Sequence, residues 1–169
     1  MRIRFELICN RSIELPPPTV DIYYKIFYPA SEQEKIEGVI DWLGSGRLED
    51  RAYIKAEDIP KADVFLNVWL RKMRNEEQYK PPHIATDSAE ESHYKTAFHE
   101  MKFVSDYTNM NFQELRSLDV LTFWRYYRDA VIYNAIQSDT GKEYLNKAYN
   151  SVQTKPDRAA IAELIESQA

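Results

Sequence analysis

The stretch Leu118–Gln137, with the sequence LDVLTFWRYYRDAVIYNAIQ, constrains the fold more than any other part of this 169-residue chain. Bulky apolar side chains recur in it at the spacing of a helical face, at Val120, Phe123, Trp124, Tyr127 and Val131. No Pro or Gly interrupts the pattern. It therefore predicts one long helix with an inward face, around which the rest of a helical core is organised.

Five residues of this helix are expected to form its structural hub: Trp124, Tyr127, Arg128, Asp129 and Val131. Trp124, Tyr127 and Val131 follow the apolar stripe and are the expected buried anchors.

The charged residues of the same helix favour a structural role. Arg125 and Asp129 are spaced i, i+4, so they can form an ion pair along the helix. Arg128 is expected to act as a tether, bonding to a helix end or holding Asp157. The alternative is a recognition patch, because Trp, Tyr and Arg are enriched among the residues that dominate interfaces.

The remainder of the second half also predicts helices with short connections. Residues that can cap a helix N-terminus stand at Ser88, Asn111, Thr140 and Thr154, and the first three have Glu three residues later. An apolar stripe from Tyr94 to Tyr107 follows the first of these caps. The second half is therefore expected to be all-helical.

The N-terminal residues instead predict strands. Residues 2–9 alternate charged and apolar side chains, and Ile13–Leu15 can pair back on them. Cys9, the single cysteine, is expected to be a small buried residue of the first strand. Thr19–Tyr28 is rich in β-branched and aromatic residues and favours another strand, with a short helix as the alternative.

Two further helices are predicted in the first half. Ser31 and Glu34 form a capping box for a helix that ends at Gly44, with Ile36, Val39, Ile40 and Leu43 on its apolar face. A short strand is expected at Ala52–Ile54. Pro60 suits the first turn of a helix over Lys61–Asn75. The basic residues near the end of that helix are expected to be solvated: Arg71, Lys72 and Arg74.

Together these patterns predict an α+β fold that is predominantly α-helical: a small N-terminal β-hairpin or sheet followed by a bundle of about six helices. Tyr79–Asp87 contains a Pro-Pro pair and no periodicity, so it is the expected linker. It separates an N-terminal α+β part (1–80) from a C-terminal helical part (88–169), and the two parts can still share one core.

The residue inventory argues against several classes of function. A net charge of −5 does not favour binding to nucleic acid, which requires a basic face. His93 and His99 are six residues apart, which places them on different sides of a helix and disfavours a metal site. No serine, thiol or paired-carboxylate signature appears, so no catalytic residue and no cofactor are predicted. No stretch approaches the length of a membrane span, and the expected location is the cytoplasm.

Partly exposed aromatic residues and one arginine are the predicted interaction surface for a protein partner: Trp69, Arg125, Tyr126, Tyr133 and Tyr149. Tyr combines an apolar body with a polar tip, which suits contact between proteins.

From Asn111 to Ile165 the chain resembles small proteins of tailed phages and prophages of Gram-positive bacteria. The residues that carry the resemblance are Phe112-Gln-Glu-Leu115, Leu118-Asp-Val120, Phe123-Trp124, Arg128-Asp129-Ala130, Thr140-Gly141-Lys-Glu143-Tyr144-Leu145 and Thr154-Lys-Pro156-Asp157-Arg158. The pattern is similar to that of tail assembly chaperones.

This resemblance implies a non-enzymatic protein in the bacterial host cytoplasm. It would coat the tape measure protein, recruit the major tail protein and self-associate on its client. Two other classes stay open from the residues themselves. One is a phage-encoded regulator or inhibitor that binds a host protein, and the other is an enzyme whose site is assembled from scattered Asp, Glu, His and Tyr residues.

Overall fold

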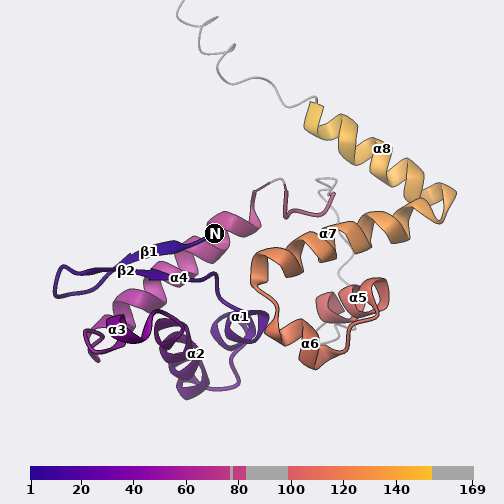
Figure 1. Ribbon diagram of the computed structural model, residues 1–169. Coiled ribbons are helices and arrows are strands. Elements are labelled where there is room, and N and C mark those ends of the chain that lie inside the picture. Colours follow the sequence, from indigo (N-terminus) through magenta and orange to yellow (C-terminus); the bar gives the residue numbers. More distant parts are fainter. Residues whose placement is uncertain (77, 83–98, 154–169) are drawn as a thin grey trace, which may run out of the picture.

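The computed structural model describes residues 1–76, 78–82 and 99–153, and these ranges contain two strands and eight helices (Figure 1). The elements, in chain order, are β1 (Ile3–Glu6), β2 (Ser12–Leu15), α1 (Val20–Phe27), α2 (Glu32–Gly44), α3 (Leu48–Arg51), α4 (Asp58–Arg74), α5 (His99–Thr108), α6 (Phe112–Ser117), α7 (Val120–Ile136) and α8 (Asp139–Gln153). The predicted fold class, an N-terminal hairpin followed by helices, is confirmed.

The hairpin buries one side of each strand, as the alternating pattern predicts. β1 and β2 are antiparallel, with Phe5 opposite Ile13 and both side chains buried. The chain turns between Leu7 and Arg11, where Asn10 has a φ of 60°, a conformation that Asn tolerates well. Cys9 lies in this turn and is exposed. The prediction of a buried Cys9 is therefore wrong, because the strand ends at Glu6.

The strand expected over Thr19–Tyr28 is also wrong, since these residues form α1. Thr19 caps the helix by accepting a hydrogen bond from the Ile22 amide at 3.4 Å. Val20, Tyr23 and Ile26 are buried at a spacing of three residues. Their burial against neighbouring helices outweighs the strand preference of β-branched and aromatic residues, which is weak and depends on context.

α2 begins after the predicted cap Ser31, but Glu34 accepts from the Ala30 amide instead of the Ser31 amide, and the buried face differs from the predicted one. Ser31 accepts from the Glu34 amide at 3.2 Å, and the Glu34 carboxylate accepts from the Ala30 amide at 2.6 Å. Val39, Trp42 and Leu43 are buried, whereas Ile36 and Ile40 are exposed. Trp42 therefore takes the core position that was assigned to the two isoleucines.

The short strand expected at Ala52–Ile54 does not form; this segment follows α3 as a turn. α4 then begins with Pro60 in its first turn, as predicted. Phe65 of α4 stacks on Trp42 of α2 and meets Phe5 of β1 edge-on, with ring centroids 6.0 and 5.4 Å apart. This trio of rings holds the hairpin against α2 and α4.

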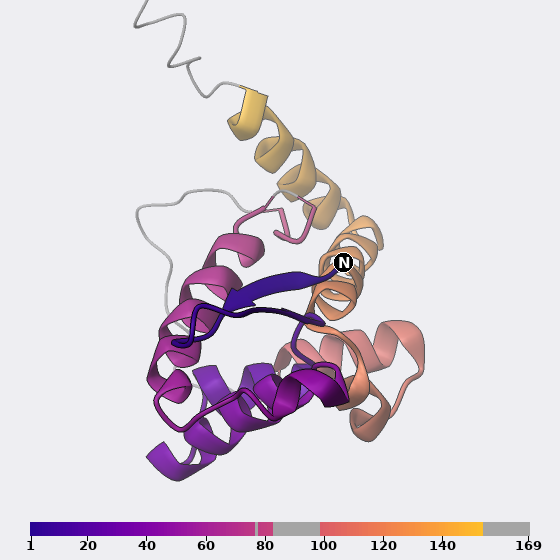
Figure 2. The same cartoon turned by 60° about the vertical axis from the view of Figure 1, so that its left-hand side comes forward.

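A backbone bridge joins the two halves of the chain. The Val20 amide donates to the Leu118 carbonyl and the Val120 amide donates to the Pro18 carbonyl, both at 2.9 Å. The first residues of α1 and α7 therefore lie side by side. Buried residues from both sides of the predicted linker, and Tyr79 within it, belong to one hydrophobic core. In Figure 2 the hairpin lies in front, with α4 on the left and α7 on the right.

Of the four helix caps predicted in the second half, the one at Asn111 is confirmed. Asn111 and Glu114 form a reciprocal capping box at the start of α6. At α8 the side chain that accepts from the Gly141 amide is Ser138, at 3.1 Å, rather than the predicted Thr140. α8 extends away from the body of the molecule (Figure 1). The helix starts predicted at Ser88 and Thr154 lie outside the described residues.

Candidate protein-binding surface

Aromatic side chains gather on the outside of the molecule where α5 packs on α7. We call His99, Phe103, Tyr107, Tyr127 and Tyr133 the aromatic surface. His99 and Phe103 both meet Tyr127 edge-on, with ring centroids 6.0 and 6.3 Å apart. Tyr107 contacts Tyr133 at 5.7 Å. The contacts form two clusters, one of His99, Phe103 and Tyr127 and one of Tyr107 and Tyr133, and each cluster joins a side chain of α5 to one of α7.

This patch remains open to solvent. Phe103, Tyr107 and Tyr133 expose 37%, 40% and 52% of their surface, and His99 is exposed as well. Tyr127 is half-buried, and its hydroxyl lies 3.3 Å from His99 Nε2. Partly exposed aromatic rings with polar tips are the side chains most enriched in protein interfaces.

The sequence spacing of α5 explains why these rings point outward. Met101 and Val104 fill the core, three residues apart, which fixes the buried face of the helix. His99, Phe103 and Tyr107 recur every fourth residue, so they form a second stripe beside the buried one.

A partly buried ion pair joins α5 to the end of α4. Arg74, at the end of α4, forms an ion pair with Glu100 and donates to the Tyr23 hydroxyl at 2.5 Å. Glu100 is 8% exposed, and its second carboxylate oxygen has no hydrogen-bond partner among the described residues. The Arg74 contact is therefore the main compensation for burying this charge. Of the three basic residues expected to be solvated, Arg71 and Lys72 are exposed, whereas Arg74 is half-buried and paired, because this end of α4 faces α1 and α5.

The tyrosines around this pair stay protonated to higher pH than free tyrosine. Burial raises the pKa of Tyr23, Tyr24 and Tyr127, and the nearby Glu100 carboxylate raises each further. Burial alone would lower the pKa of Arg74, but Glu100 holds it raised. Arg74 and the three tyrosines thus keep hydrogen-bond donors at this junction over the whole neutral range.

The charges at the rim of the aromatic surface are matched within the chain. Lys102 pairs with Asp106 along α5, and Arg128 pairs with Asp129 on α7 at 3.3 Å. These pairs leave little net charge beside the rings. The surface is therefore suited to an apolar or aromatic partner face rather than to a strongly charged one.

The structure separates the residues of the predicted interaction surface. Tyr133 belongs to the aromatic surface, and Tyr149 is 66% exposed on α8. Trp69 and Tyr126 are half-buried and pack against the core. Arg125 is exposed; it donates to the Gln78 side chain at 3.3 Å and lies over the Tyr79 ring at 5.4 Å.

The residues of the predicted hub differ in burial. Trp124 is 1% exposed, whereas Tyr127 and Val131 are half-buried. Asp129 pairs with Arg128 instead of forming the expected pair with Arg125. The suggested contact of Arg128 with Asp157 lies outside the described residues.

Sequence reasoning missed His99, Phe103 and Arg74 as contributors to this region and assigned Tyr107 to a buried stripe. The four-residue spacing on α5 could have indicated a second aromatic face. The partner of Arg74 could not have been found, because it depends on where α5 crosses the end of α4.

Within the described residues, no group of three or more His, Cys, Asp or Glu side chains is arranged to hold a metal ion. None of the described helices has both the length and the apolar character required to cross a membrane.

Comparison with protein-family models, with curated proteins and with solved structures finds no match for this chain.

Proposed function

We propose that this protein is a non-enzymatic binding protein whose aromatic surface holds an apolar face of a protein partner. The observation that carries the proposal is a set of exposed and half-buried rings where α5 packs on α7, with two ion pairs on the same helices. Exposed aromatic residues that gather on one face supply large contact area at low conformational cost.

We further propose that the partner is the tape measure protein of a tailed phage, and that the chain acts as a tail assembly chaperone that also engages the major tail protein. The support for this part is the resemblance of residues 111–165. A long helical client with an apolar stripe is the kind of partner that an uncharged row of rings would fit.

The test is binding of the full chain to a helical segment of a tape measure protein from a tailed phage of Gram-positive bacteria, measured by calorimetry. We expect the double variant Tyr107→Ala with Tyr133→Ala to weaken binding by at least tenfold, about 1.4 kcal/mol or more. Leu48→Ala is the matched control, because Leu48 is 80% exposed but lies on α3. Equal losses in both variants, or no binding of the segment, would refute the chaperone assignment.

The same experiment distinguishes the alternative of a regulator that binds a host protein. Suppose that the tape measure segment does not bind, but the full chain binds a host protein and the Tyr107 and Tyr133 double variant does not. The aromatic surface then keeps its role as a binding surface, and the assignment of the partner is wrong.

A further inference from the structure

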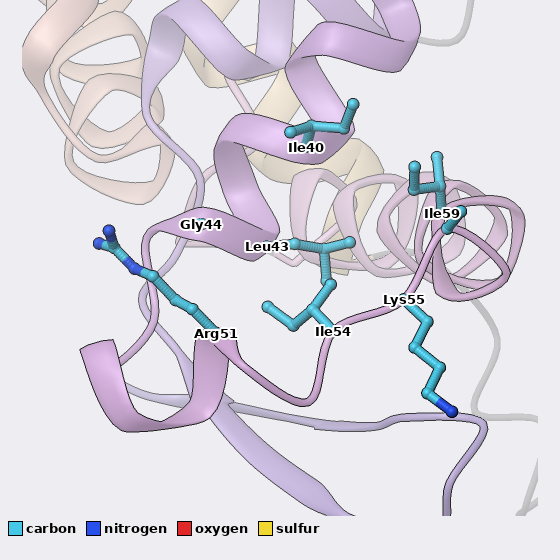
Figure 3. Close-up of a pocket in the computed structure, with 8 residues that line it drawn as sticks. Ile40, Leu43, Gly44, Arg51, Ile54, Lys55 and Ile59 are labelled. Carbon is cyan, nitrogen blue, oxygen red and sulfur yellow. The ribbon is translucent and has the colours of Figure 1, made fainter.

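An apolar hollow lies on other helices than the aromatic surface. This open hollow of about 310 Å³ is lined by the end of α2, the end of α3 with the connection to α4, and the first turn of α4 (Figure 3). Its volume is at the lower end of the range of ligand pockets, about 300–1,000 Å³, and is suited to one or two side chains.

Branched apolar side chains form its walls. Figure 3 shows Leu43 and Ile54 pointing toward one another, with Ile40 and Ile59 beside them. Ile40 is 46% exposed, and Ile54 and Ile59 are half-buried. Covering these side chains would remove apolar surface from water, which favours an apolar occupant.

Two cations stand at the rim. Arg51 and Lys55 are exposed, and their side chains extend to opposite sides of the hollow (Figure 3). Their side chains have no ion pair among the described residues.

Three carboxylates of the neighbouring segments are engaged elsewhere, whereas Glu57, two residues after Lys55, is exposed. Asp50 pairs with Arg11 at 3.1 Å, and Asp41 pairs with Lys25 at 2.9 Å. Asp58 accepts from the Ile8 and Lys55 amides at 2.7 and 2.8 Å. The charge of the rim is therefore available to a ligand.

We propose that this hollow binds a short segment of a partner protein in which one or two branched apolar residues are flanked by carboxylates. The apolar residues fill the space between Leu43 and Ile54. The carboxylates before and after them meet Arg51 and Lys55. Two cations on opposite sides match a segment with acids at both ends better than a fatty acid, which has a single carboxylate. Two isolated cations without an aromatic ring in the lining do not make a nucleic-acid site.

The test uses the full chain and a fluorescein-labelled hexapeptide, Glu-Glu-Leu-Ile-Glu-Glu, with fluorescence anisotropy as the readout. Two control peptides have the same length: Lys-Lys-Leu-Ile-Lys-Lys reverses the charge, and Glu-Glu-Ala-Ala-Glu-Glu removes the branched side chains. We expect the first peptide to bind at least tenfold more tightly than either control. Octanoate is the competing ligand and is expected to displace it weakly or not at all.

A charge swap provides the decisive variant. Arg51→Glu with Lys55→Glu is expected to weaken binding of the acidic peptide at least tenfold and to reverse the preference toward the basic peptide. A reversal cannot arise from misfolding. Arg71→Glu with Lys72→Glu makes the same change in net charge at an exposed site on α4 and is expected to leave the preference unchanged.

The proposal is overturned if the acidic peptide does not bind, if the two charge types bind equally, if octanoate binds while the peptide does not, or if both double variants act alike. These outcomes do not depend on Tyr107 or Tyr133, so the hollow and the aromatic surface are tested separately.

Discussion

At the scale of single residues, Arg74 determines how the two halves of the chain meet. It joins the end of α4 to Glu100 of α5 and to Tyr23 of α1, three elements that are distant in sequence. One oxygen of the Glu100 carboxylate has no hydrogen-bond partner among the described residues, so the Arg74 contact is the main compensation for burying its charge. Its loss should therefore reduce stability more than the loss of an ordinary surface ion pair.

Arg74→Met should therefore destabilise the protein. Removing one partner of a fully buried pair costs about 3–5 kcal/mol, and because the Arg74 side chain is 40% exposed we expect about 1–3 kcal/mol. Urea unfolding at neutral pH measures the loss. Arg71→Met, at an exposed position on the same helix, is the control. If the two variants unfold at the same free energy, the pair has no structural role.

Tyr23 should make stability depend on alkaline pH. Burial raises its pKa in the folded protein above the unfolded value of 10.0, so the unfolded chain loses the proton first. The contribution of Tyr23 is present below about pH 10 and is lost as pH rises above it.

Tyr23→Phe should accordingly reduce the fall in unfolding free energy between about pH 9 and about pH 11. The fall should not disappear, because Tyr24 and Tyr127 also have raised pKa values. Urea titrations at several pH values measure the slope, and an unchanged slope in the variant would contradict this account.

At the scale of elements, the corner between α7 and α8 depends on a glycine. A Cβ at Gly141 would overlap the Ala135 carbonyl oxygen and lie 2.7 Å from its carbonyl carbon. Both atoms belong to the backbone of α7, so they cannot move aside without shifting the helix.

Gly141→Ala should destabilise the protein by about 1–3 kcal/mol, the usual cost of overpacking, and should loosen α8 first. Urea unfolding and amide hydrogen exchange along α8 measure both effects. Gly44→Ala is the matched control, because a Cβ there meets nothing within 4 Å. It should be neutral or stabilising by up to about 1 kcal/mol. Similar losses in both variants would mean that the corner is not tight.

At the scale of the whole molecule, the shared core predicts that both halves unfold together. The Thr19–Asp119 bridge and the burial of Trp124 beside Tyr23, with ring centroids 5.4 Å apart, couple the first half to the second. We expect one cooperative transition in urea, and amides in α2 and α7 should exchange with the same free energy. Two separate transitions would indicate independent domains on either side of the predicted linker.

The sequence by itself determined where α2 and α6 begin, because a helix cap is a local feature. Ser31 and Asn111 satisfy backbone amides within a few residues of themselves, so their roles can be read from spacing alone. The Leu118–Gln137 helix follows from its apolar stripe in the same way, and α7 spans most of it.

What only the tertiary structure decided is which faces these elements bury. α1 is a helix because Val20, Tyr23 and Ile26 pack against neighbouring helices, and Tyr107 is exposed because Met101 and Val104 take the core side of α5. The ion pair of Arg74 with Glu100 and the hollow between Leu43 and Ile54 join segments that no local pattern connects. Burial and pairing depend on how distant elements pack, and a periodic sequence specifies a face without specifying what covers it.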